Sequence, residues 1–306
     1  MDARDDDTWP EPDPDALIAQ LRASGSVFAE EEYAVLLAHA EAIGAGDAEL
    51  VADRLDLFID RRVHGERIEH IVERAQFAEL GVHVDFGVFV PRSRTVLLAT
   101  IVAERLRELQ GARGAADPPP RLLDFGCGSG AIAALAAHRV PGIEVVAVDS
   151  DPFAIACAER NLPDARLVQA NSILALVAAD ASAAEDPVRV DATDARPPRR
   201  ISASAPYDVI AANLPYVPSS QLQLLPNGTL ESEPLTALDG GDDGLDPLGE
   251  HALAMSGLLR DGGMLITEIA PHQAELGIEI LELAGFGRIE LCSDDELDAT
   301  VLIGHR

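Results

Sequence analysis

The sequence predicts a doubly wound α/β fold with a mostly parallel sheet, preceded by a small helical domain. From residue 121 onward, short apolar runs typical of strands alternate with helical segments, beginning with "RLLDF" and "GAIAALAAHRV". Such alternation implies parallel strands joined by crossover helices. The last two strand-like runs, "GFGRIELCSD" and "ATVLIGHR", are separated by a loop too short for a parallel crossover. They are therefore expected to form an antiparallel hairpin.

The N-terminal part of the chain predicts helices. Residues 1–15 are rich in Asp and Pro and read as a disordered acidic tail. Residues 16–66 form the expected helical domain, in which apolar side chains recur at helical spacing at Tyr33, Leu36, Leu37 and Ala40. A second helix is expected to begin after Asp47, a good N-cap, and to stop at Gly65.

The pattern changes after the helical domain. Residues 67–92 hold short β-like runs around Gly81 and Gly87, which predict a β-hairpin linker. A helix over about 93–110 opens the main domain, 93–306.

Besides the C-terminal hairpin, the main domain is expected to contain five strands and three covering helices. The strands are predicted at 121–125, 143–149, 165–170, 207–213 and 262–270, and the helices at 130–140, 151–161 and 248–259. The segment 180–205, rich in Ala, Asp, Pro and Arg, predicts a flexible insertion.

Composition limits the class of protein. The chain has 306 residues, of which 47% are hydrophobic, enough for a sizeable core. Its net charge of −30 repels phosphate backbones, so a nucleic-acid partner is not expected. The N-terminus has no apolar signal region and no apolar run reaches spanning length, so a cytoplasmic protein without membrane attachment is expected.

Cysteine and histidine spacing predicts no metal site. The three cysteines, Cys127, Cys157 and Cys292, form no C-x-x-C pair, and no H-x-x-x-H pair occurs.

A glycine-rich turn follows the first strand of the main domain. In "LLDFGCGSGAIA", Gly126, Gly128 and Gly130 let the backbone approach a ligand at a helix N-terminus, with Cys127 and Ser129 between them. With Ala131 the run also satisfies G-x-G-x-x-A, a dinucleotide fingerprint.

Polar residues at the ends of three strands help to identify the ligand. Asp149, 19 residues beyond Gly130, can accept hydrogen bonds from both hydroxyls of a ribose, which NAD and S-adenosylmethionine share. Asp124, just before the glycines, suits a cationic amino-acid ligand better than a pyrophosphate. Asn171 and Ser172 follow the third strand and offer polar partners to an adenine.

The run "AANLPYVP" follows the fourth strand and predicts the reacting end of the site. Asn213 offers a side-chain carbonyl, and Leu214, held extended by Pro215, can direct its backbone carbonyl into the pocket. Tyr216 offers a flat face. Two carbonyl acceptors and a ring make a receptor for a planar –NH₂ group, in an amide or a nucleobase.

These motifs carry a resemblance to a known family. Asn-Leu-Pro-Tyr is similar to the [N/D]-P-P-[Y/F/W] motif of amino-group methyltransferases. Its flanks, "NLPYVPSSQLQLLP", "ESEPLTALDGGDDGLDPL" and "GVFVPRSRTVLL", resemble those of the HemK-type protein-(glutamine-N5) methyltransferases. The helical domain joined through a hairpin also resembles that family, as does the layout of a class I methyltransferase. The resemblance covers roughly residues 30–306.

The resemblance implies S-adenosylmethionine as cofactor and a glutamine in the Gly-Gly-Gln loop of a peptide chain release factor as substrate. It also implies that Asn213 and the Leu214 carbonyl hold the amide –NH₂, while Tyr216 packs on the amide plane. The chain differs from the family at three places: Leu214 replaces a proline, Arg94 and Val96 replace acids of a P-R-P-E-T-E pattern, and Asn171 replaces an acid near the adenine. These differences favour a divergent member.

Two other hypotheses remain open from the sequence. Asn-Leu-Pro-Tyr also resembles the motif of rRNA adenine dimethyltransferases, so a nucleic-acid adenine N6-methyltransferase is the main alternative. The charge of −30 and the "EPLTALDGGDDGL" run favour the glutamine enzyme. A binding module that has lost catalysis is disfavoured because Asn213 and Tyr216 are both present.

Overall fold

The computed structural model describes residues 13–114, 116–173, 175–176, 206–225 and 229–306. The insertion predicted at 180–205 lies outside these residues, as does the predicted tail over 1–15 apart from its last three positions.

The chain divides into two compact units. The described residues of the first fall within 13–74 and 229–232, and the second comprises 75–225 and 233–306.

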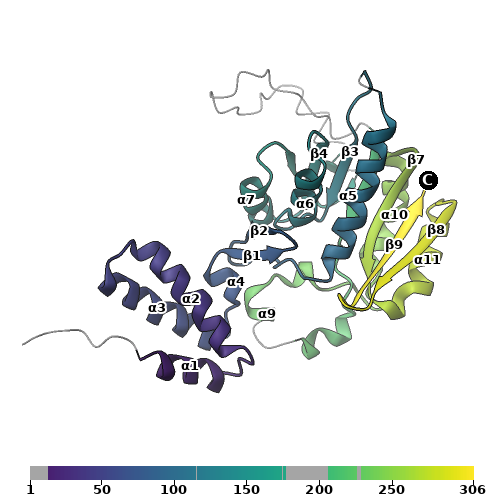
Figure 1. The fold of residues 1–306 in the computed structure, drawn as a ribbon. Coiled ribbons are helices and arrows are strands. Elements are labelled where there is room, and N and C mark those ends of the chain that lie inside the picture. Colours follow the sequence, from purple (N-terminus) through teal and green to yellow (C-terminus); the bar gives the residue numbers. More distant parts are fainter. Residues whose placement is uncertain (1–12, 115, 174, 177–205, 226–228) are drawn as a thin grey trace, which may run out of the picture. The chain divides into compact units, whose positions relative to one another are not determined.

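The first unit is helical (Figure 1). Its elements are α1 (Pro14–Ala23), α2 (Ala29–Gly44), α3 (Ala48–Val63), α4 (Ile68–Ile71) and α9 (Thr229–Ser232). As expected, the Asp47 carboxylate caps α3 by accepting from the backbone N–H groups of Glu49 and Leu50. The helical face predicted from "EEEYAVLLAHAEAIG" packs with α1 and α3 into one core, in which Leu21, Leu36 and Leu55 are buried.

The second unit begins at the second residue of β1 (Arg74–Phe77), which pairs with β2 (Leu80–His83) in a two-stranded sheet. The chain turns at Ala78, which has a φ of +50°, so Gly81 lies inside β2 and not at the turn.

A seven-stranded sheet forms the centre of the second unit (Figure 1). Its strands are β3 (Arg121–Phe125), β4 (Glu144–Asp149), β5 (Arg166–Gln169), β6 (Tyr207–Ala212), β7 (Leu259–Ile269), β8 (Arg288–Asp294) and β9 (Ala299–His305). The spatial order is β5-β4-β3-β6-β7-β9-β8. Strands β3 to β7 are parallel, and β9 runs antiparallel to both of its neighbours. The class I methyltransferase fold with a C-terminal antiparallel hairpin is confirmed.

Helices cover both faces of this sheet. One face packs against α5 (Thr95–Ala112), α6 (Ala131–Arg139) and part of α7 (Pro152–Asn161). The other packs against α10 (Asp246–Leu258) and α11 (Ala274–Leu283). Successive residues of β3, such as Leu122 and Leu123, contribute to opposite cores. A strand buried on both faces needs a continuous apolar run, which explains why "RLLDF" and "YDVIAA" do not alternate.

Within the described ranges, no helix is both long enough and apolar enough to cross a lipid bilayer.

Candidate active site

The polar residues predicted from sequence meet at one edge of the sheet. Strands β4, β3 and β6 are neighbours and run parallel, so their carboxyl ends point the same way. The register pairs Phe125, the last residue of β3, with Ala212, the last residue of β6. The glycine turn and Asn213 therefore leave the sheet side by side. Crevices at such strand ends are the usual ligand sites of open α/β sheets.

The glycine turn depends on its glycines. Gly126, Gly128 and Gly130 have φ values of +75°, +54° and +79°, a region that L side chains rarely adopt. A Cβ at Gly130 would lie 2.7 Å from the side chain of Leu162, so this glycine also allows the start of α6 to pack closely against the end of α7. A Cβ at Gly126 would lie 3.5 Å from the side chain of Leu214, which places the turn directly against the Asn-Leu-Pro-Tyr loop.

Asp124 lies beneath the turn and is fully buried. Its Oδ2 accepts from the Ala133 N–H at 3.2 Å, which ties β3 to the first turn of α6. Burial raises the pKa of Asp124 to about 7, against the opposing effect of that hydrogen bond. Its Oδ1 is buried without a hydrogen-bond partner among the described residues.

Asp149 is the last residue of β4, and its carboxylate contacts the glycine turn. Its Oδ2 accepts from the Gly128 N–H at 2.8 Å, and its Oδ1 from the Asp151 N–H at 3.0 Å. Burial raises the pKa of Asp149. Each oxygen keeps acceptor capacity beyond these bonds, since a carboxylate offers about four lone-pair directions.

The other residues that the sequence predicts to bind the cofactor differ in their surroundings. Cys127 is buried, and burial raises the pKa of its thiol well above the ordinary value, so it is a small apolar residue and not a nucleophile. Ser129 is buried as well. Asn171 is exposed just past β5, and the Ser172 hydroxyl accepts from the Ala175 N–H at 3.2 Å.

The Asn-Leu-Pro-Tyr loop is held in place by buried polar partners. Asn213 Nδ2 donates to Thr95 Oγ1 at 3.2 Å, and the Tyr216 hydroxyl donates to Glu268 Oε1 at 2.7 Å. Burial raises the pKa of Tyr216. Leu214 is 8% exposed and packs in the core that contains Phe125.

The "LDGGDDGL" loop lies against the same segment. Val217 donates to the Leu238 carbonyl at 3.1 Å, and Gly240 donates back to the Val217 carbonyl at 2.8 Å. Gln273 Nε2 bridges the Tyr216 carbonyl and the Asp243 carbonyl, at 2.9 and 3.0 Å. The "LDGGDDGL" loop therefore supports the Asn-Leu-Pro-Tyr loop through backbone carbonyl and N–H groups.

Sequence reasoning missed several residues that organise this site. They are Thr95, Glu268 and Gln273 around the Asn-Leu-Pro-Tyr loop, and Asn161 beside the glycine turn. One signal was available, because a Glu inside the apolar strand "LITEIA" must be buried and therefore needs partners.

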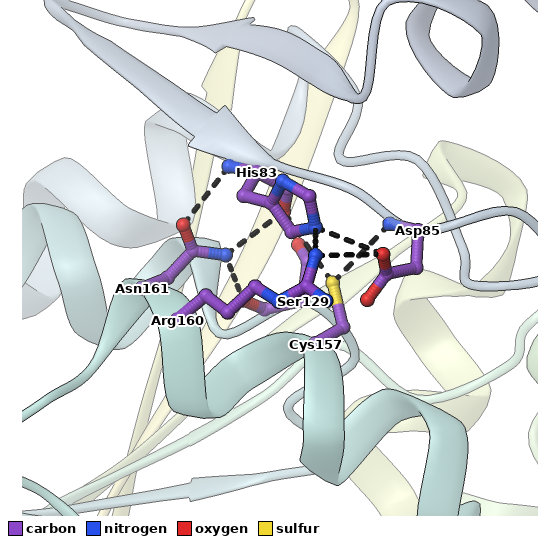
Figure 2. Close-up of polar contacts among 6 residues, drawn as sticks. All are labelled: His83, Asp85, Ser129, Cys157, Arg160 and Asn161. Atoms are coloured by element: carbon purple, nitrogen blue, oxygen red, sulfur yellow. Dashed lines mark hydrogen bonds and ion pairs between the residues drawn. The ribbon is translucent and has the colours of Figure 1, made fainter.

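Asn161 links the β1–β2 hairpin to the glycine turn (Figure 2). Its Oδ1 accepts from the His83 N–H at 2.9 Å, and its Nδ2 donates to the carbonyls of His83 and Ser129, each at 2.8 Å. The position of the glycine turn is thereby coupled to that of β2.

Next to this link lies a group that resembles a metal site. Ligand atoms of His83, Asp85 and Cys157 all lie within 4.8 Å of one another. Figure 2 shows the Arg160 guanidinium against both His83 and Asp85, and it donates to Asp85 Oδ1 at 3.1 Å. Burial also raises the pKa of the Cys157 thiol to about 11. Because Arg160 already supplies a positive charge and the thiol keeps its proton, we interpret this cluster as a set of polar contacts that holds the segment after β1 and β2 against α7.

Comparisons with known proteins agree with this geometry. Residues 108–231 match the model of the methyltransferase small domain family. A release factor glutamine methyltransferase from Moorella thermoacetica is 32% identical over 243 residues, which cover 79% of this chain and 76% of that protein. The enzyme of the same name from Escherichia coli is 30% identical over 302 residues, which cover 94% of this chain and 95% of that protein.

Among solved structures, a human methyltransferase 10 domain containing protein superimposes with a TM-score of 0.46 and 15% identity, over 74% of this chain and 89% of that one. The two long sequence matches carry the assignment. The chain belongs to the release factor glutamine methyltransferase family.

Proposed function

We propose that this chain methylates the side-chain amide nitrogen of a protein glutamine, in the Gly-Gly-Gln loop of a peptide chain release factor. The observation that carries the proposal is the arrangement of Asn213, Leu214 and Tyr216 beside the glycine turn, in a chain that matches enzymes named for this reaction over most of its length. Because release factors work in the cytoplasm, the proposal includes a cytoplasmic location.

The residues beside the glycine turn fit S-adenosylmethionine, the cofactor of this enzyme. A Cβ at Gly128 would meet nothing within 4 Å, which leaves room for a ligand close to the backbone of the turn, and Asp149 would accept from the ribose hydroxyls. Asp124 Oδ1, buried and without a partner among the described residues, provides an acceptor beneath the turn for the cationic amino-acid end. When bound, this cofactor supplies a methyl group made electrophilic by its sulfonium.

The proposed reacting loop, residues 213–216, fits an amide –NH₂. Thr95 occupies the donor side of Asn213, so its carbonyl Oδ1 is the group left for substrate. The carbonyl of Leu214 accepts no hydrogen bond from the described residues and supplies the second acceptor. Because the Tyr216 hydroxyl donates to Glu268, the ring is the part of Tyr216 that would contact the amide plane.

The geometry explains why Leu214 can replace a proline. Its side chain points toward Gly126 and is almost fully buried, while the proposed contact uses its backbone carbonyl. Pro215 still restrains the backbone of residue 214 to an extended form. The substitution therefore changes one wall of the cofactor side and leaves the amide receptor in place.

The chemistry rests on positioning. An amide nitrogen is a poor nucleophile because its lone pair is delocalised, and no ordinary side chain deprotonates it first. Two carbonyls that accept both amide hydrogens hold the nitrogen in line and increase electron density on it. Alignment of this kind lowers the activation free energy by up to roughly 7–11 kcal/mol in favourable cases. The hydrogen bonds contribute further by stabilising the charge that develops on the –NH₂ group.

Labelled cofactor tests the proposal. The protein is incubated with S-adenosylmethionine carrying a labelled methyl group and either a release factor with Gly-Gly-Gln or total RNA. We expect label on the release factor, and none when its glutamine is replaced by alanine. Label on RNA alone would show a nucleic-acid methyltransferase instead, and label on neither would mean a different protein substrate or an inactive relative.

A further inference from the structure

The last turn of α7 lies between the β1–β2 hairpin and the glycine turn, and it bonds to both (Figure 2). The hairpin also contains a junction in the chain, because the N-terminal segment of the first unit ends at Arg74 and the second unit begins at Ala75, both in β1. The proposed methyl transfer uses no residue of this hairpin. Its contact with the glycine turn is therefore not explained by the reaction itself.

Asn161, the last residue of α7, uses its side-chain amide to join the two segments. Its Oδ1 accepts from the His83 N–H at 2.9 Å. The two hydrogens on its Nδ2 are donated to two carbonyls, those of His83 and Ser129, each at 2.8 Å. The amide therefore pairs with both backbone groups of His83, as a neighbouring strand would, and also holds the backbone of the glycine turn.

This arrangement requires an amide side chain in one orientation. Rotation of the Asn161 amide by 180° would place its oxygen against two carbonyls and its –NH₂ against the His83 N–H, so the partners fix the orientation. An aspartate has the same shape but no donor for the two carbonyls. Asparagine thus supplies the two donors and the one acceptor that these three backbone groups need.

The contact lies close to the groups proposed to bind the cofactor. Ser129 follows Gly128, whose N–H donates at 2.8 Å to Asp149, the proposed acceptor for the ribose hydroxyls. At the next position of the turn, a Cβ on Gly130 would lie 2.7 Å from the side chain of Leu162, just past the end of α7. A shift of this end of α7 would therefore displace the turn at two adjacent residues.

We infer that Asn161 is a positioning residue that couples the β1–β2 hairpin to the cofactor site, so that each stabilises the other. S-adenosylmethionine binds the glycine turn in the position that Asn161 holds, and Asn161 is itself held by the hairpin. By thermodynamic linkage, the bound cofactor holds the hairpin on α7 more firmly by a similar factor. The inference rests on the proposed function only in naming S-adenosylmethionine as the ligand of the turn.

Cys157 provides a matched control, because it lies four residues earlier on the same face of α7. Its Sγ donates to the same His83 carbonyl at 3.4 Å and accepts from the Asp85 N–H at 3.4 Å. Among the residues that the structure describes, the hydrogen bonds of this thiol go to the segment after β2 and not to the glycine turn. Cys157→Ala therefore loosens the hairpin on α7 and leaves the Asn161 contacts in place.

The affinity for S-adenosylmethionine, measured by calorimetry, tests the coupling. Asn161→Ala removes both contacts, and Asn161→Asp keeps the shape but directs a carboxylate at two carbonyls. We expect Kd to rise about 5- to 50-fold in both variants, within the usual range for coupled sites. Cys157→Ala should lower Tm and leave Kd close to that of wild type. If Kd rose no more in the Asn161 variants than in Cys157→Ala, Asn161 would be merely structural and the inference would be wrong.

Hydrogen exchange of the His83 backbone amide, followed by NMR, measures the coupling in the other direction. In wild type, saturating S-adenosylmethionine should slow this exchange by a factor similar to the rise in Kd for Asn161→Ala. The slowing should persist in Cys157→Ala and disappear in Asn161→Ala. Equal exchange with and without the cofactor in wild type, a comparison that needs no variant, would overturn the inference even if the enzyme methylates release factors. Slowed exchange in a protein that leaves release factors unlabelled would overturn the proposed function alone.

Discussion

Asn213 is the residue on which the proposed chemistry depends most. It leaves β6 next to the glycine turn, its Nδ2 is held by Thr95, and its Oδ1 remains for the substrate. A mutation that removes one stabilising group from a reacting centre typically costs on the order of 10²- to 10³-fold in kcat.

We therefore expect Asn213→Ala to lower the rate of methyl transfer at least 100-fold on this scale. Binding of S-adenosylmethionine, measured by calorimetry, should weaken only modestly, because Asp149 and the glycine turn are untouched. Transfer near the wild-type rate would show that Asn213 is wrongly assigned.

Asp124 affects stability through its titration. Its pKa in the folded protein is about 7, against an ordinary value of 3.8, because burial disfavours the charge. The protonated form is the favoured one, so the folded state is most stable below about pH 4 with respect to this group. It loses that stability as the pH rises through about 7.

Asp124→Asn removes the titration and keeps a carbonyl that can accept from Ala133. In cofactor-free protein, the free energy of unfolding of this variant should exceed that of wild type by an amount that grows by roughly 1–3 kcal/mol between pH 5 and pH 8. Urea unfolding at each pH measures it. A difference that stays constant over this range would show that Asp124 does not ionise as proposed.

At the scale of elements, the reacting loop is supported by the loop before α10. Gly244 has a φ of +85°, and a Cβ there would lie 2.3 Å from the Tyr216 carbonyl oxygen. Gly285 has the same φ but nothing within 4 Å of a built Cβ. An alanine at either position would strain the backbone equally, but only an alanine at Gly244 would also collide with Tyr216.

Both Gly244→Ala and Gly285→Ala should lose stability, by about 1 kcal/mol for the positive φ alone. Only Gly244→Ala should also displace Tyr216, so kcat should fall in that variant and remain unchanged in the Gly285 variant. Thermal unfolding and turnover are measured on both proteins. Equal turnover in the two variants would mean that the loop contact is irrelevant to catalysis.

For the whole molecule, charge is the property that separates the candidate substrates. A net charge of −30 repels nucleic-acid phosphates over most of the surface. We expect no binding to ribosomal RNA fragments at 0.15 M salt and micromolar protein in a gel-shift assay. Saturable binding that weakens steeply with added salt would restore the nucleic-acid hypothesis.

Much of the fold was predictable because its signals are local. The strands of the main domain and its early helices follow from runs such as "RLLDF" and "IEVVAVD", whose burial on both faces requires apolar residues throughout. The hairpin character of β8 and β9 follows from the short loop between them. The insertion of β9 between β7 and β8 was not predictable, since strand order depends on pairing over long distances in the sequence.

By itself, the sequence determined the fold class and the main chemical groups. The positions of the glycine turn, Asp149 and Asn213 follow from motifs read along the chain. Only the tertiary structure showed what holds the Asn-Leu-Pro-Tyr loop: Asn213 bonds to Thr95, 118 residues away, and Tyr216 bonds to Glu268, 52 residues away. A hydrogen bond between distant residues leaves no spacing pattern in a sequence. The partners of Asn213 and Tyr216 are therefore decided by the tertiary structure alone.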